Sequence, residues 1–163
     1  MLEFSIITDK ENTLSFDCGV ESLNKYLKEY ALINQSRKLN VTIVAKDNHS
    51  QIVGYYTLCP AQIEAELLPK KIARGLPKYP VPALRLCRLA VDIKFQKKNF
   101  GKELLINSLR KCYQLSLEIG GFCIIVDAID EKAKIFYEHF GFESINDSLC
   151  LFMPMKAIEP YMV

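Results

Sequence analysis

The fold of this chain is decided by the stretch VDIKFQKKNFGKELL, residues 91–105. An apolar run ends at Val91, a short basic turn containing Gln96, Asn99 and Gly101 follows, and a helical pattern then begins. A turn that opens a helix presents free backbone N–H groups and the positive end of the helix dipole, which together favour a phosphate or pyrophosphate. The stretch therefore predicts a site for a phosphorylated cofactor.

Length and composition favour one domain over residues 1–163, because 163 residues that are 50% hydrophobic can build one sizeable core. We expect a soluble, cytoplasmic protein, since no signal-peptide pattern and no apolar run of membrane-spanning length is present. The six cysteines form no CxxC pair and only two histidines accompany them, so we expect free thiols and no metal site.

The charge is unevenly distributed along the chain. Residues 70–102 hold ten Lys and Arg against one acid, Asp92, a net charge of +9, so the total of +2 leaves −7 for the remainder. This asymmetry indicates a face that meets a polyanion. A solvated face, with lysine stems covering apolar surface, is the alternative.

Periodicity predicts a mixed sheet with helices on its faces, an α/β (α+β) fold in three layers. Strands are expected over 2–7, 41–45, 52–58, 84–91, 122–128, 142–144 and 149–153, and helices over 23–33, 100–119 and 130–140. Residues 60–82 are proline-rich and are expected to be mostly loop. Ser22 or Asp17 is expected to cap the first helix and Asp130 the last, with Gly120 and Gly141 ending the second and third helices.

Two motifs carry a family resemblance. The pattern Q/R-x-x-G-x-G/A stands here as QKKNFG, residues 96–101, with Asn99 in place of the first glycine. The pattern A-x-x-F-Y-x-x-x-G-F is complete in residues 133–142. Together they resemble the GNAT family of acetyl-CoA-dependent N-acetyltransferases, which implies acetyl-CoA as cofactor and two central strands that splay apart. Asn tolerates left-handed backbone geometry better than other non-glycine residues, so the turn is expected to survive.

A finer resemblance reaches most of the chain. The segments FDCGVESLNKYL (16–27), GYYTL (54–58), RLAVD (88–92) and LFMPM (151–155) are similar to the GNAT toxins of toxin–antitoxin modules. That subfamily implies acetylation of the aminoacyl amine of charged tRNA and a small ribbon-helix-helix antitoxin as partner. It also implies a possible homodimer.

The resemblance implies cofactor contacts from two motifs. The backbone of the strand before the turn would pair with the pantetheine arm, and the amides of the turn would hold the pyrophosphate with help from lysine charge. The strand residues are Leu89, Ala90 and Val91; the turn residues are Gln96, Lys97, Lys98, Asn99, Phe100, Gly101 and Lys102; the second motif adds Ala133 and Phe136.

Tyr137 is the residue that the resemblance implies as general acid for the departing coenzyme A thiolate. A phenol with a pKa near ~10 stays protonated at neutral pH and suits a thiol leaving group. The base is open: a charged α-amine has a pKa near ~8, so water or a backbone carbonyl can suffice. Asp127 is a candidate base in the substrate site, and a structural hydrogen-bond acceptor is its alternative role.

The candidate tRNA contacts are basic residues of the positively charged segment, whose phosphate contacts would make binding salt-dependent. They are Lys70, Lys71, Arg74, Lys78, Arg85 and Arg88. Arg85 and Arg88 are an odd number of positions apart on one strand, so their side chains should face opposite sides of the sheet. Arg88, in the R-L-A-V motif, is preferred as the substrate contact. The alternative role of Arg88 is an ion pair with a helix. Two other functions stay open: a GNAT enzyme for a small amine or protein N-terminus, and a binding module without turnover.

Overall fold

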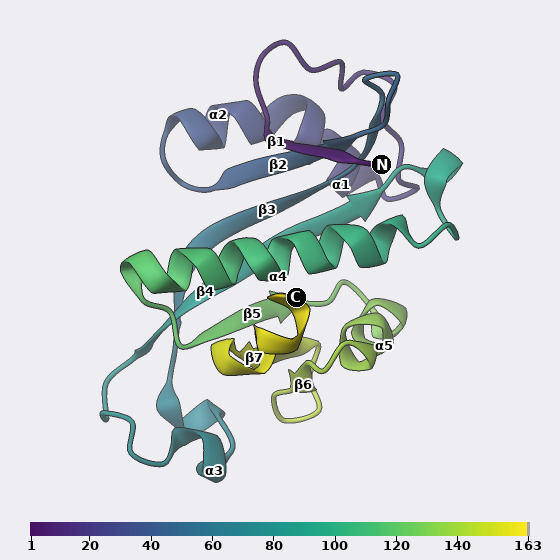
Figure 1. Cartoon of the computed structure of the whole chain (residues 1–163). Helices are drawn as coiled ribbons and strands as arrows, with labels where there is room; N and C mark the ends of the chain where they lie inside the picture. The colour runs from purple at the N-terminus through teal and green to yellow at the C-terminus, as the bar shows by residue number, and fades with distance from the viewer. Residues whose placement is uncertain (163) are drawn as a thin grey trace. The chain divides into compact units, whose positions relative to one another are not determined.

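The computed structural model describes residues 1–162 and contains one seven-stranded sheet in the order β1-β2-β3-β4-β5-β7-β6 (Figure 1). The strands are β1 Glu3–Ile6, β2 Val41–Lys46, β3 Ile52–Ile63, β4 Val81–Val91, β5 Cys123–Asp127, β6 Glu143–Ser144 and β7 Cys150–Pro154. The helices are α1 Glu21–Lys25, η1 Tyr26–Tyr30, α2 Ala31–Ser36, η2 Ala65–Leu67, α3 Lys70–Ala73, η3 Ile93–Phe95, α4 Phe100–Ile119, α5 Glu131–His139 and η4 Met155–Met162. The predicted mixed α/β class is confirmed.

The chain divides into two compact units. Unit 1 comprises Met1–Cys59 with Cys87–Ser108, and unit 2 comprises Pro60–Leu86 with Leu109–Val163. The unit boundaries fall inside β3, β4 and α4. The single domain expected from the sequence stays a prediction.

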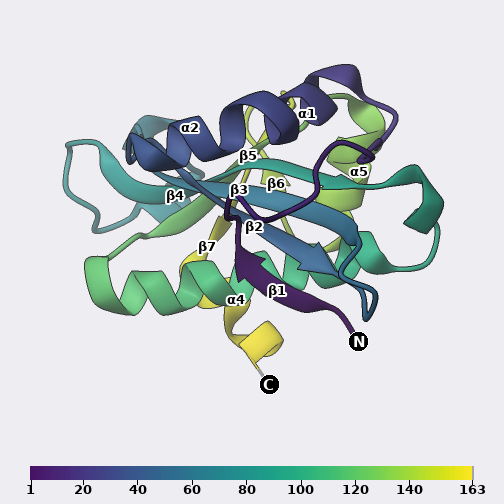
Figure 2. The same cartoon turned by 90° about the horizontal axis from the view of Figure 1, so that it is seen from above.

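In unit 1, β1, β2 and β3 form an antiparallel ladder, and α1 and α2 lie along one face of it (Figure 2). The helices bury Tyr26, Leu27 and Ala31 against strand residues such as Val44 and Tyr55. The Tyr55 hydroxyl donates a 2.7 Å hydrogen bond to the Leu23 carbonyl, which fixes the helix on the sheet. The helices and the strands of unit 1 therefore pack against each other as two layers.

The first helix differs from the sequence expectation in its middle. Residues 26–30 form a π-helical turn, which inserts an extra residue and rotates all that follows. Tyr30 and Ile33 of this helix are consequently exposed. The capping expectation was also wrong: Val20 occupies the N-cap position and makes no side-chain hydrogen bond there.

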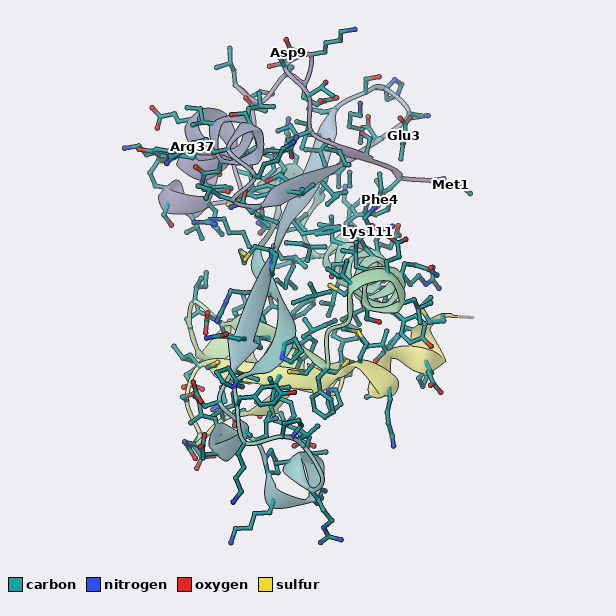
Figure 3. The ribbon with its side chains drawn as sticks, turned by 90° about the vertical axis from the view of Figure 1, so that its left-hand side faces the viewer. Met1, Glu3, Phe4, Asp9, Arg37 and Lys111 are labelled. Carbon is teal, nitrogen blue, oxygen red and sulfur yellow. The ribbon has the colours of Figure 1, made fainter. Side chains whose placement is uncertain are left out.

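Figure 3 shows Arg37, just after α2, and Asp9, after β1, pointing away from the strands.

In unit 2, β4 and β5 run parallel over Ala83–Leu86 and Cys123–Val126, and β7 pairs antiparallel with β5. Their core includes Ile125 and Phe152. The expectation for 60–82 was only partly right, because β3 continues to Ile63, β4 begins at Val81, and two short helices lie between them. Both strands run longer than expected, and they include Pro60 and Pro82.

The predicted helix ends of unit 2 are confirmed. Asp130 caps α5 by accepting a 2.8 Å hydrogen bond from the Ala133 amide. Gly120 and Gly141 follow α4 and α5 with φ of 84° and 101°, a geometry that glycine adopts without strain. Among residues 1–162, no helix is long and apolar enough to cross a membrane.

Candidate active site

The turn of residues 96–102, called the phosphate turn below, connects η3 to α4. Lys97 and Asn99 adopt left-handed geometry, with φ of 63° and 65°. Left-handed geometry at Asn99 confirms the sequence expectation; a second such residue at Lys97 was not foreseen. Left-handed residues within a right-handed turn direct successive amides toward one point, a concavity that suits an anion.

The amides of the phosphate turn are available. Within residues 1–162, the N–H groups of residues 97–102 donate no hydrogen bond to another residue. The side chains of Lys97, Lys98 and Lys102 are exposed, and Lys98 Nζ lies 6.0 Å from the ring centroid of Phe95. The turn thus combines free donors, positive charge and the N-terminus of a 20-residue helix, which is what a pyrophosphate requires.

Asp92 holds the start of this turn in place. Its side chain is 2% exposed, and its carboxylate oxygens accept hydrogen bonds from the amides of Lys94 at 2.9 Å and Asp17 at 3.1 Å. The Gln96 side chain adds a second tie, because its Nε2 donates to the carbonyls of Val91 and Cys18. Gln96 therefore braces the turn with its side chain and leaves only its backbone for a ligand.

The FDCG segment is the other half of this brace. The Asp17 carboxylate accepts hydrogen bonds from the Gly19 amide and from Asn24 Nδ2, each at 2.9 Å, while Asn24 Oδ1 accepts one from the Cys18 amide. These bonds hold the pKa of Asp17 below its ordinary value, the Gly19 amide contributing most. The Asp17 carbonyl also accepts the Ile93 amide at 2.8 Å. Sequence reasoning missed this role, although the motif itself was visible.

Strand β4 carries the expected cofactor-arm residues Leu89, Ala90 and Val91. Its parallel pairing with β5 covers only Ala83–Leu86, so these three residues lie beyond the paired stretch. Strand β5 itself ends at Asp127, one position past the last pair, so the splaying of the two strands stays a prediction. On the β3 side the approach is close: a Cβ added to Gly54 would lie 2.6 Å from the Ala90 carbonyl oxygen.

Arg88 lies against the π-helical turn. Its guanidinium carbon is 3.6 Å from the centroid of the Tyr26 ring, a cation–π contact in place of the ion pair considered from sequence. Tyr26 is buried, stacks on Tyr30 and accepts a hydrogen bond from Asn34. A π-helical turn is frequently found at functional positions, and here it presents the ring that orients Arg88.

In unit 2, Tyr137 lies on α5 and is 7% exposed. The rings of Phe136 and Phe142 contact it edge to face, at centroid distances of 5.3 and 5.6 Å. Burial raises the pKa of Tyr137 above its ordinary value. The phenol therefore stays protonated throughout the neutral range, as a proton donor must.

Asp127 ends β5, is exposed, and forms an ion pair with the Arg85 guanidinium. This contact favours the structural role of Asp127 over the role of base, and it gives Arg85 a partner on the sheet. The other basic candidates, Lys70, Lys71, Arg74 and Lys78, are all exposed and form no ion pair within residues 1–162. Figure 1 shows α3, which begins this group, standing away from β5 and β7.

Metal chemistry finds no support in the described residues, since no group of three or more His, Cys, Asp or Glu side chains there is arranged to hold an ion. Cys18, Cys112 and Cys123 are buried, and Cys59, Cys87 and Cys150 are half-buried.

The chain is similar to known acetyltransferases over most of its length. Residues 38–144 match the family described as acetyltransferase (GNAT) domain. A tRNA-acetylating toxin of Mycobacterium tuberculosis (strain ATCC 25618 / H37Rv) is 36% identical over 152 residues, covering 92% of this chain and 90% of the toxin.

Solved structures agree over the full chain. The AtaT toxin complexed with acetyl-methionyl-tRNAfMet matches with a TM-score of 0.91 and 30% identity, covering 100% of both chains. A tyrosine-to-phenylalanine mutant of AtaT, bound to the C-terminus of the antitoxin AtaR and to acetyl-CoA, matches with a TM-score of 0.82 and 30% identity. That match covers 98% of this chain and 96% of the AtaT chain.

Proposed function

This chain belongs to the GNAT acetyltransferase family, and from that membership we propose that it transfers an acetyl group from acetyl-CoA to the aminoacyl amine of charged tRNA. The observation that carries the proposal is the 36% identity to a tRNA-acetylating toxin over 92% of the chain. The AtaT complex with acetyl-methionyl-tRNAfMet supports the same substrate class.

The phosphate turn fits the cofactor. Its unengaged amides, two left-handed residues and three exposed lysines form a cradle for a pyrophosphate. The backbone of Leu89, Ala90 and Val91, beyond the β5 pairing, is available to bind the pantetheine amides as a strand would. Ala133 and Phe136, both half-buried on α5, would contact the cofactor from the second motif.

When bound, acetyl-CoA supplies the acetyl thioester. Tyr137 holds a proton on its phenolic oxygen and gives it to the departing thiolate, a role for which a neutral, buried phenol is suited. The α-amine needs to lose a proton before it attacks; its pKa of about 8 lets water or a backbone carbonyl accept that proton. Asp127 is then not needed as a base, and its role is the ion pair with Arg85.

The tRNA would bind through phosphate contacts with Lys70, Lys71, Arg74 and Lys78, while Arg88 approaches the substrate end. An enzyme that acts on charged tRNA would work in the cytoplasm. A small antitoxin of the ribbon-helix-helix type is proposed as partner, supported by the AtaT complex with AtaR. A homodimer is also proposed, on the subfamily resemblance alone.

The test is transfer of radiolabelled acetyl from acetyl-CoA to total charged tRNA. Label should appear in the aminoacyl fraction and leave as N-acetyl-amino acid when the ester is hydrolysed. Tyr137→Phe should lower the rate by about 10²–10⁴-fold and leave acetyl-CoA affinity unchanged.

Tyr161→Phe is the matched control, because its hydroxyl donates only to the Phe140 carbonyl, at 2.9 Å, and its removal should not affect the rate. Label found on polyamines or protein N-termini, and not on tRNA, would contradict the tRNA substrate. Acetyl-CoA binding without transfer to any amine pool would contradict catalysis altogether.

A further inference from the structure

Two thiols from different strands meet in unit 1. Cys59 of β3 and Cys87 of β4 are 28 positions apart in sequence, and their Sγ atoms are 3.1 Å apart. A disulfide has an S–S length of about 2.05 Å, so about 1 Å of approach separates the two thiols from a covalent bond.

The surrounding backbone holds the two cysteines opposite each other. The Asp92 amide donates a 2.8 Å hydrogen bond to the Val53 carbonyl, and Gly54 lies directly against Ala90. Increasing residue numbers along β3 thus face decreasing residue numbers along β4, as they do in antiparallel neighbours. Facing positions in such a pair have Cβ atoms about 4.5–5.5 Å apart, and a disulfide has Cβ atoms about 3.5–4.5 Å apart, so the lower end of the first range meets the upper end of the second.

The other cysteines are in less reactive surroundings. Burial raises the pKa of Cys18; it also raises the pKa of Cys112 and of Cys123 to about 12, and that of Cys150 to about 11. Thiols react with oxidants as thiolates, so these four resist oxidation. Cys59 and Cys87 are half-buried, and each has a second thiol in contact.

We propose that Cys59 and Cys87 form a reversible redox pair, which a hydroperoxide oxidises to an intrachain disulfide. One thiolate attacks the peroxide oxygen, giving a sulfenic acid and releasing water or, from an organic peroxide, an alcohol. The second thiol then attacks that sulfur, the S–S bond forms, and the sulfenic oxygen leaves as water. Two thiols are oxidised, one peroxide is reduced, and a dithiol reverses the change by exchange.

The disulfide would close residues 60–86 into a covalent loop. This loop holds the exposed basic side chains Lys70, Lys71, Arg74 and Lys78. The proposed modification site is thus at the base of the segment to which tRNA contacts are assigned. The existence of the redox pair does not depend on that assignment.

The first test treats the reduced full-length protein with about one equivalent of hydrogen peroxide, then denatures it and alkylates the remaining thiols. We expect the mass to show two of the six thiols oxidised, a peptide map to join Cys59 to Cys87, and dithiothreitol to restore all six. Disulfides between chains, a scatter over several cysteines, or sulfinic acid on one of the pair would overturn the proposal.

Matched variants separate the pair from other thiols. Cys59→Ser and Cys87→Ser should each abolish the intrachain disulfide, whereas Cys150→Ser, which removes another half-buried thiol, should leave it intact. A second probe needs no oxidation: phenylarsine oxide bridges neighbouring dithiols and should form a one-to-one adduct with the native wild-type protein. An adduct that survives Cys59→Ser, or that fails to form on wild type, would contradict the assigned pair.

Discussion

At the scale of single residues, the site depends on side chains that hold backbone in place rather than on side chains that touch a ligand. Asp92 is the clearest case, because its buried carboxylate accepts hydrogen bonds from the Lys94 amide, in the η3 helix just before the phosphate turn, and from the Asp17 amide. Replacement by a group that donates as well as accepts should leave one of these amides without its partner.

Asp92→Asn should therefore destabilise the fold by about 1–3 kcal/mol and weaken acetyl-CoA binding. Calorimetry with acetyl-CoA and thermal unfolding measure the two effects. Asp47→Asn is the matched control: Asp47 also accepts backbone amides, those of His49 and Gln51, but in the β2–β3 turn. Asp47→Asn should lower stability and leave acetyl-CoA affinity unchanged. An equal loss of acetyl-CoA affinity in both variants would contradict the role of Asp92 in holding the cofactor site.

Asn99 tests the backbone geometry of the phosphate turn. At a φ of 65°, a residue with a Cβ and no polar side chain costs roughly 1–2 kcal/mol, and glycine costs nothing. Asn99→Ala should weaken acetyl-CoA binding by about tenfold, whereas Asn99→Gly should bind at least as well as wild type. Binding titrations decide this; equal affinities for Ala and Gly would show that left-handed geometry is not what the turn needs.

Tyr137 sets the alkaline limit of the reaction. The rate should rise with pH as the substrate α-amine, with a pKa near ~8, loses its proton. Because burial raises the pKa of Tyr137, the acid form persists and no fall in rate is expected up to about pH 10. Initial rates, corrected for ester hydrolysis, measure this profile. A fall in rate that begins near pH ~8.5 would mean that the acid is another group or that Tyr137 is not shielded.

The sequence allowed the turn before α4 to be predicted, and left-handed geometry at Asn99 with it, because local spacing determines a turn at a helix start. Asp92, Asp17 and Asn24 were not foreseen as a brace. Their bonds join positions up to 75 residues apart, and no local pattern reports such a pairing. Arg88 was placed in the substrate region, but its aromatic partner depended on a π-helical turn that periodicity does not predict.

At the scale of elements, the close approach of β3 to β4 positions the cofactor-arm strand. A Cβ on Gly54 would lie 2.6 Å from the Ala90 carbonyl oxygen and equally close to Leu104. Backbone, unlike a side-chain tip, cannot turn aside, so the strand segment around Ala90 would have to shift.

Gly54→Ala should cost about 1–3 kcal/mol in unfolding free energy and also reduce acetyl-CoA affinity, because the displaced strand is the one proposed to bind the cofactor arm. Gly120→Ala is the control, since its added Cβ meets nothing within 4 Å and only its φ of 84° is strained. Denaturant unfolding measures the loss of stability in each variant, and titration with acetyl-CoA measures the loss of affinity. Full cofactor affinity in Gly54→Ala would contradict the role given to this contact.

Most elements could be predicted from sequence, and the errors share a cause. Strands β3 and β4 extend into the proline-rich segment, whereas the composition alone suggested loop. The first helix lies where the sequence predicts it. Its side chains after residue 26 face other directions than expected, because the extra residue of the π-helical turn η1 rotates them and exposes Tyr30. Local composition predicts where elements lie; tertiary packing decides where they stop.

At the scale of the whole molecule, the uneven charge predicts how tRNA binding responds to salt. Each of Lys70→Ala, Lys71→Ala and Arg74→Ala should weaken tRNA binding and reduce the slope of log K against log salt by about 0.7–0.9 for each phosphate that the variant no longer binds. Arg37→Ala removes the same charge from an exposed position after α2 (Figure 3) and should leave the slope unchanged. Filter binding across a salt series measures this, and equal slopes for all four variants would assign the tRNA-binding residues elsewhere.

The brace between Asp17 and Asp92 also bears on the order in which the molecule folds. Contacts of long sequence separation form late, because chain entropy must decrease before they can stabilise anything. The phosphate turn can be locked only after residues from both ends of unit 1 have come together across 75 positions. A chain still emerging from the ribosome therefore cannot form this brace until residue 92 has been made, so more than half of the chain is synthesised before the phosphate turn can be held in place.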